Sequence, residues 1–207
     1  MYDFVSQVVS LGYWRDWQRQ ALAELRGRRV LDLAFGTGNT LLDLRAAGYD
    51  PIGLDLSPAM IRITKRKLHK FRAVVPLTRG RAQQLPFADA SFDSILCTFP
   101  ARFIVDPGTL DQLARVLCPG GRIVVVALSK LTGSNIWVRV LRWLYRVTGQ
   151  RTPLPELESQ VSFPGLTYKT IWKSVKDSAV LLVVFERRVD DSPTLGYTVP
   201  HSNQSPC

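Results

Sequence analysis

One segment constrains the fold of this chain more than any other. Residues 30–35 form a short aliphatic run, Gly36 and Gly38 mark a tight turn, and a helical pattern follows at once to about residue 47. Where a strand leads through such a turn into a helix, backbone N–H groups and the positive end of the helix face a ligand. Glycines lack the Cβ atoms that would hinder a close approach. The segment therefore predicts a ligand site at the start of this helix.

Strands and helices alternate after this segment. We expect further strands at 51–55, 74–78, 92–99 and 122–128, with helices at 58–71 and 109–117 between them. Ser57 before Pro58 is a specific start signal for the first of these helices. The strands are almost continuously apolar, which is typical of a parallel sheet covered on both faces.

The end of the chain has a different pattern. Residues 167–175 carry lysines, as an edge strand does, whereas 179–187 are almost wholly apolar. We expect a hairpin whose second strand inserts next to 122–128. The predicted fold is therefore α/β, a Rossmann-like seven-stranded sheet that is mostly parallel, with one reversed strand near the C-terminal end and helices on both faces. Residues 1–188 are expected to form one domain that opens with a helical cap at 1–29, and 189–207 a disordered tail.

Three ligand classes compete for the glycine turn. A triphosphate-binding loop requires a Lys after its last glycine, and none follows Gly38. A dinucleotide fingerprint requires a third small residue, where this chain has Leu41, so NAD or FAD is disfavoured without being removed. S-adenosylmethionine is the third class.

Several motifs together favour the third class. Asp32, Ala34, Gly36 and Gly38 form one pattern, and Asp55 stands 23 residues after Asp32 at the end of the next predicted strand. With the segments 80–87, 91–95 and 113–122, they resemble the class I S-adenosylmethionine-dependent methyltransferases. The resemblance covers about residues 1–188 and is greatest to the ubiquinone/menaquinone-biosynthesis type and its small-molecule relatives.

The resemblance implies S-adenosylmethionine as cofactor and a set of residues that bind it. A carboxylate such as that of Asp55 can accept hydrogen bonds from both hydroxyls of a ribose. The implied cofactor-binding residues are Tyr2, Asp32, Ala34, Phe35, Gly36, Gly38, Asp55, Leu56, Met60, Ala82, Gln83, Thr98 and Phe99.

Two positions depart from the family pattern. Arg81 stands where relatives usually have an aspartate that contacts the adenine amino group, and Arg offers no acceptor. Adenine binding would then depend on Gln83, a backbone carbonyl or stacking. Phe35 replaces a smaller residue. A protein that has lost cofactor binding is therefore an alternative.

No catalytic residue can be named from the sequence, and no cluster of carboxylates suggests a metal. His69 and His201 are expected to be exposed.

The helix predicted at 134–147 carries three arginines on one arc and apolar residues on a wide remaining arc. In relatives the insertion at 129–166 helps to cover the substrate. The surplus apolar surface favours a lipophilic acceptor pocket or a peripheral membrane contact, with burial against 1–25 and 148–166 as the alternative.

Charge and cysteine content complete the prediction. The net charge is +10, and no acidic residue lies between Asp55 and Asp89, where eight arginines and lysines stand. This block is expected to be a solvated helix face, although phosphate of RNA or of a membrane is an alternative partner. Nucleic acid is disfavoured because no recognised binding module is present and 98–101 lacks the motif of amino-directed base methyltransferases.

Three widely spaced cysteines fit a cytoplasmic enzyme. We expect methyl transfer to a small, lipophilic acceptor, with an RNA methyltransferase or a non-catalytic protein as alternatives.

Overall fold

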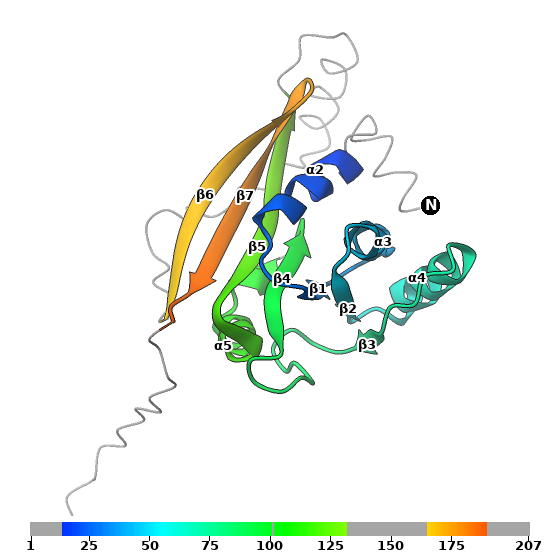
Figure 1. The fold of residues 1–207 in the computed structure, drawn as a ribbon, viewed down its shortest axis with the longest axis horizontal. Coiled ribbons are helices and arrows are strands. Elements are labelled where there is room, and N and C mark those ends of the chain that lie inside the picture. Colours follow the sequence, from blue (N-terminus) through cyan, green and yellow to red (C-terminus); the bar gives the residue numbers. More distant parts are fainter. Residues whose placement is uncertain (1–13, 101, 132–164, 190–207) are drawn as a thin grey trace, which may run out of the picture.

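A seven-stranded sheet forms the centre of the molecule (Figure 1). The computed structural model describes residues 14–100, 102–131 and 165–189. In the sheet the strands follow the order β3-β2-β1-β4-β5-β7-β6. The strands are β1 (Arg29–Leu33), β2 (Asp50–Asp55), β3 (Leu77–Arg79), β4 (Phe92–Thr98), β5 (Leu117–Leu131), β6 (Leu166–Val175) and β7 (Ser178–Arg187).

The topology confirms the predicted fold class. Strands β3, β2, β1, β4 and β5 pair in parallel, whereas β7 runs antiparallel to both of its neighbours, β5 and β6. The last hairpin turns at Lys176, whose φ of +50° is left-handed. Its second strand lies beside β5, as the apolar pattern of 179–187 indicates.

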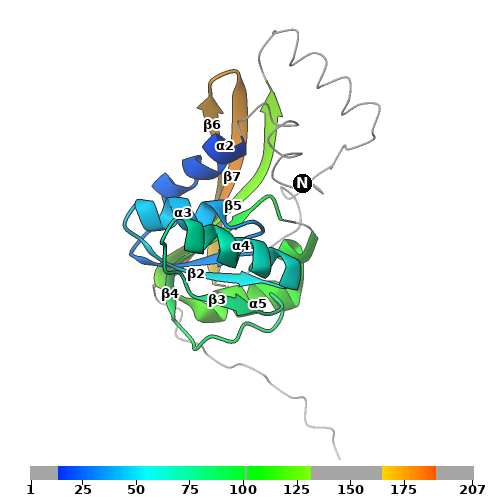
Figure 2. The same cartoon turned by 90° about the vertical axis from the view of Figure 1, so that its right-hand side faces the viewer.

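Helices cover both faces of the sheet (Figures 1 and 2). On one face lie α2 (Trp14–Gln20), α3 (Asn39–Ala46) and α4 (Pro58–Lys70), and on the other α5 (Pro107–Val116). Two short 3-10 helices are η1 (Leu22–Glu24) and η2 (Arg102–Val105). Side chains of β1 alternate between these layers: Val30 packs with Trp17 of α2, whereas Leu31 and Leu33 pack with Leu113 of α5.

Some boundaries differ from the prediction for local reasons. β3 is shorter than 74–78 and begins at Leu77, because Pro76 has no N–H to donate to a ladder. α5 begins at Pro107 rather than Thr109, because the Asp106 side chain caps the helix by accepting from the Thr109 N–H at 3.0 Å. β5 starts at Leu117 rather than Arg122, with an irregularity in its pairing to β4 between Phe92 and Ser94.

Several predictions lie outside the described residues: Tyr2 and the first half of the cap, most of the insertion 129–166 with its helix 134–147, and the tail with His201. The domain boundaries therefore remain predictions. Within the described ranges, no helix combines the length and the apolar character that a membrane span requires.

Candidate functional site

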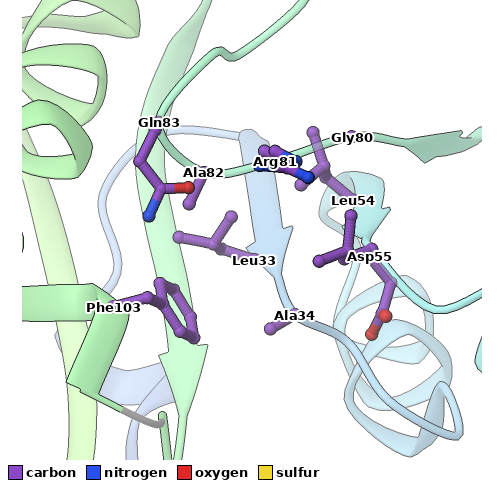
Figure 3. Close-up of a pocket in the computed structure, with 10 residues that line it drawn as sticks. Leu33, Ala34, Leu54, Asp55, Gly80, Arg81, Ala82, Gln83 and Phe103 are labelled. Carbon is purple, nitrogen blue, oxygen red and sulfur yellow. The ribbon is translucent and has the colours of Figure 1, made fainter.

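A cavity of about 360 Å³ opens where the parallel strands end (Figure 3). Its lining comes from the segments that follow β1, β2, β3 and β4, so four carboxyl strand ends contribute. This is the edge at which open α/β sheets bind ligands. The lining residues are Leu33, Ala34, Leu54, Asp55, Leu56, Gly80, Arg81, Ala82, Gln83 and Phe103.

Asp55 is the acidic residue of this cavity, and two backbone amides fix its side chain. Oδ2 accepts from the Gly36 N–H at 2.9 Å, and Oδ1 accepts from the Ser57 N–H at 2.8 Å. The residue is buried, yet each oxygen keeps a further lone pair for a ligand. Such a carboxylate suits two neighbouring hydroxyl groups, as in a ribose.

The two glycines of the turn serve different purposes. Both have a left-handed φ, +57° at Gly36 and +76° at Gly38. A Cβ at Gly36 would meet nothing within 4 Å, so this glycine leaves open space beside Asp55. A Cβ at Gly38 would lie 2.4 Å from Cγ2 of Thr64, so this glycine also admits helix α4. Its part in cofactor binding stays a prediction.

Thr64 and Ala34 complete the turn. The Thr64 hydroxyl, fully buried on α4, donates to the Gly36 carbonyl at 3.0 Å and so ties the turn to the helix. Ala34 has a φ of +57°, a conformation that favours glycine, and its N–H donates to the Leu54 carbonyl at 2.7 Å. An alanine thus occupies a position whose backbone conformation suits a glycine.

Asp32 lies beneath the turn on β1 and is fully buried. Neither carboxylate oxygen has a hydrogen-bond partner among the described residues. Burial, and then the charge of Asp55, raise the pKa of Asp32 well above its ordinary value of 3.8. An unpartnered carboxylate of this kind fits a cationic ligand group, because a nearby positive charge would stabilise its ionised form.

The opposite side of the cavity from Asp55 is formed by Gln83 and Phe103, with Leu33 and Ala34 between the two sides (Figure 3). Ala82 is buried, whereas the side chains of Arg81 and Gln83 are exposed. A flat apolar ring could lie against Leu33, Leu54 and Phe103, with the Gln83 amide as donor or acceptor. Phe103, on η2, was not predicted, because nothing local distinguishes it from a packing residue.

Other predicted site residues lie outside the lining of this cavity. Phe35 is buried and packs over Gly53, whose added Cβ would lie 2.6 Å from its ring. Met60 lies in the first turn of α4, where its N–H donates to the Ser57 hydroxyl. Thr98 and Phe99 end β4 and face α2, so their role in binding remains a prediction.

α2 contacts the end of β4 through Gln18, which the sequence did not single out. Its Nε2 donates to Oγ1 of Thr98 at 3.0 Å, and its buried Oε1 has no partner among the described residues. Phe99 stacks on Trp14 with ring centroids 4.1 Å apart. The predicted helical cap therefore does reach a strand end next to the site.

The chemistry of the site also depends on whether the Cys97 thiol can ionise and on whether the residues could hold a metal ion. Burial, together with Asp32, raises the pKa of the Cys97 thiol far above its ordinary range, so the thiol stays protonated. His69 is exposed on α4, as expected. No group of His, Cys, Asp or Glu that could hold a metal ion occurs within 14–100, 102–131 and 165–189.

Comparison with known proteins agrees with this geometry. A profile of the ubiE/COQ5 methyltransferase family matches residues 1–156. The chain is 34% identical over 180 residues to a demethylmenaquinone methyltransferase of Deinococcus radiodurans, an alignment that covers 79% of this chain and 74% of that protein. A second demethylmenaquinone methyltransferase, of Paenarthrobacter aurescens, is 39% identical over 179 residues, with 84% and 67% covered.

Solved structures share the fold. A proposed S-adenosylmethionine-dependent methyltransferase of Methanococcus maripaludis superposes with a TM-score of 0.66 at 14% identity, over 93% of this chain and 92% of that one.

Proposed function

The chain belongs to the ubiE/COQ5 methyltransferase family, and we propose that it transfers a methyl group from S-adenosylmethionine to a small, lipophilic acceptor of the quinone class. Membership makes it an S-adenosylmethionine-dependent methyltransferase. One structural observation carries the proposal. Asp55, held by the Gly36 amide, lines a cavity whose opposite side offers the Phe103 ring and the Gln83 amide, which matches a nucleoside with its diol and its base.

The residues present fit the cofactor in three places. The carboxylate of Asp55 would accept from the ribose hydroxyls, and the open space at Gly36 would admit the sugar and its chain. Asp32 supplies a buried, unpartnered carboxylate where a ligand ammonium group would be stabilised. Gln83 and Phe103 would hold the base. When bound, S-adenosylmethionine supplies a methyl group on a sulfonium, which is an electrophile with a good leaving group.

The protein's own part in such a reaction is positioning. Because the leaving group is already good, binding residues need mainly to align the acceptor and to exclude water, and alignment can contribute several kcal/mol, up to about 10. Among the described residues, the Asp55 carboxylate at the cavity is held by two backbone amides and assigned to the cofactor, the Cys97 thiol is buried, and His69 lies exposed on α4. We therefore assign orientation, and no proton transfer, to the residues around the cavity.

The nature of the acceptor rests on the relatives. Two of them are demethylmenaquinone methyltransferases by name, which favours a lipophilic quinone-like acceptor for this chain. A peripheral membrane contact through 134–147, and a cytoplasmic location, are part of the same proposal. Nucleic acid is a less favoured acceptor, because the cavity residues suit one small cofactor and the relatives act on no nucleic acid by name.

The test is methyl transfer by the full-length chain. Purified protein is mixed with S-adenosylmethionine and a demethylmenaquinone with a short side chain, and product mass and the demethylated cofactor are measured. We expect the acceptor to gain one methyl group in wild type and little product with Asp55→Asn. Methylation of an RNA substrate, but not of the quinone, would contradict the proposed acceptor. If the demethylated cofactor forms with neither substrate, the proposed acceptor and the proposed methyl transfer would both be contradicted.

A further inference from the structure

We propose that the outer face of α4 is a docking surface for an anionic lipid bilayer. The surface consists of Arg62, Lys65, Arg66, Lys70 and Arg72 together with the exposed apolar side chains Ile63, Phe71 and Val74, and we call it the basic surface. All eight residues lie on α4 or directly after it (Figure 2). None lines the cofactor cavity.

The cations of the basic surface have no ion-pair partner in the part of the chain that the structure describes. No carboxylate of the described residues lies within ion-pair distance of these five side chains, and no acidic residue occurs from 56 to 88. Elsewhere the described arginines and lysines are mostly paired. Those in ion pairs are Arg15, Arg19, Arg26, Arg28, Arg29, Arg45, Arg115, Arg122, Lys173 and Lys176. Most described cations away from α4 are therefore neutralised by a carboxylate, whereas the five of the basic surface face no described carboxylate and suit an outside anion.

Helix geometry places these charges on the face opposite the core. Thr64 and Leu68 are buried, and at roughly 100° per residue Arg66 points in the opposite direction. Arg62, Arg66 and Lys70 follow one another at i, i+4 and i+8 and so fall within an arc of about 80°. Like charges at this spacing destabilise an isolated helix. An arrangement with this cost is understandable where a negatively charged surface binds to it.

The exposed apolar residues select a bilayer over nucleic acid. Ile63 is 40% exposed, Phe71 61% and Val74 85%. Ile63 and Val74 are aliphatic and have no stacking role on bases, whereas all three side chains gain by insertion between lipid headgroups and acyl chains. Phe71 caps the C-terminal end of α4 and Val74 follows it, so one end of the cationic face carries the apolar side chains.

The location of the basic surface connects it with the acceptor, a step that rests on the proposed function. Leu56 lines the cofactor cavity, is 55% exposed and lies two residues before Pro58, where α4 begins. Docking through α4 would therefore bring the cavity close to the bilayer in which a lipophilic quinone dissolves. Anionic lipid would attract the protein to that surface, and the acceptor would be met there.

Vesicle sedimentation of the full-length chain tests this surface. Vesicles of phosphatidylcholine alone are compared with vesicles that contain about one third phosphatidylglycerol. We expect binding only to the anionic vesicles. This binding should be lost when salt is raised from about 0.1 M to about 1 M, because the Debye screening length falls from about 10 Å to about 3 Å. The triple variant Arg62→Gln, Arg66→Gln, Lys70→Gln should bind about a hundredfold more weakly, since each basic side chain contributes about fivefold.

A matched control removes the same charge elsewhere. Arg28→Gln, Lys169→Gln and Arg188→Gln change exposed cations away from α4 and should leave most of the binding intact. Phe71→Ser with Val74→Ser should weaken vesicle binding without changing the charge. Thermal unfolding of the α4 triple and of Phe71→Ser with Val74→Ser should match wild type, because these side chains make no ion pair with a described residue. The control triple should melt slightly lower, because Arg28→Gln removes one exposed ion pair with Asp50.

The outcomes separate this surface from the enzymatic proposal. Equal loss of vesicle binding in both triple variants, or full vesicle binding by the α4 triple, would overturn the docking surface. An α4 triple that loses RNA binding in a gel-shift assay while its vesicle binding is unchanged would overturn it too. Transfer to a short-chain quinone without vesicles should be the same in wild type and the α4 triple. If wild type shows no transfer but the α4 triple alone loses vesicle binding, the proposed function fails and the docking surface stands.

Discussion

The backbone N–H of Gly36 donates to Oδ2 of Asp55 at 2.9 Å, so the turn after β1 and the acid that ends β2 hold each other in place. The Ser57 N–H binds the other oxygen at 2.8 Å. The carboxylate is therefore oriented before any ligand arrives. A site fixed in this way loses little entropy when the ligand binds.

Asp55→Asn should weaken S-adenosylmethionine binding by about ten- to a hundredfold. The substitution removes the charge and turns one of two acceptor oxygens into an NH₂ that faces a backbone N–H, an unfavourable contact of about 1–3 kcal/mol. Calorimetric titration with the cofactor measures the change. Asp50→Asn, at the exposed start of β2, is the matched control and should leave the affinity as in wild type. Equal affinities in Asp55→Asn and wild type would contradict the assigned role.

The fold could be predicted from the sequence because its signals are local. Apolar runs, the Ser57-Pro58 start signal and the lysines of β6 each report on their own segment, and the hairpin placed β7 beside β5 correctly. Boundaries were wrong where a side chain decided them, as with the Asp106 cap of α5. The fold class was confirmed, and the errors were a few residues at element ends.

The site was predictable only in part, for a physical reason. Asp55, Ala34, Ala82 and Gln83 lie at or just after strand ends and line the cavity, while their part in cofactor binding stays a prediction. Phe103 and Gln18 reach the site region through tertiary packing, which no local pattern reports. A Cβ at Gly38 would meet Thr64, 26 residues further along the chain, and this packing requirement could not be predicted from the turn alone. Which surface a glycine leaves free depends on elements that the turn itself does not contain.

Asp32→Asn should stabilise the cofactor-free protein and weaken cofactor binding. The pKa of Asp32 is raised in the folded state, so the folded protein holds this proton more tightly than the unfolded chain. Its contribution to stability is thus fully present below the ordinary value of 3.8 and is lost as pH rises through the folded pKa. Asn has no such loss, so the variant should gain about 1–3 kcal/mol at neutral pH.

Thermal unfolding against pH, without and with S-adenosylmethionine, checks this trade-off. The difference between Asp32→Asn and wild type should be near zero at the acid end and grow as pH rises. Saturating cofactor should raise the melting temperature of wild type more than that of the variant, because only the carboxylate stabilises a ligand cation. A variant less stable than wild type at neutral pH would show that the carboxylate has a partner.

Arg81→Asp should tighten S-adenosylmethionine binding. Arg81 lines the cavity, and its side chain can only donate hydrogen bonds. An aspartate would accept from the adenine amino group, which is the contact that the resemblance to the family implies. One good hydrogen bond to a charged group is worth about 1.5–3 kcal/mol, or roughly a ten- to hundredfold gain. Arg72→Asp makes the same charge change after α4 and should leave the affinity unchanged. A weaker cofactor complex in Arg81→Asp would instead indicate that the guanidinium stacks on the base.

The two glycines of the turn should respond differently to the same substitution. Gly36→Ala places a methyl in open space at a φ of +57°, the value that Ala34 already adopts, so folding should lose only about 1–2 kcal/mol while cofactor affinity falls tenfold or more. Gly38→Ala places a methyl 2.4 Å from Cγ2 of Thr64 and should displace α4, at a cost of about 3 kcal/mol or more to stability.

Chemical unfolding and cofactor titration of both variants measure the contrast, and Thr64→Ala in each background supplies the control. Thr64→Ala removes the two nearest atoms that the new methyl of Gly38→Ala would meet, so it should recover part of that variant's stability and none of the affinity of Gly36→Ala. Because Thr64 also donates to the Gly36 carbonyl, the substitution alone should cost about 1 kcal/mol. If Gly36→Ala bound the cofactor as tightly as wild type, the open space beside Asp55 would not be the path along which the ligand approaches.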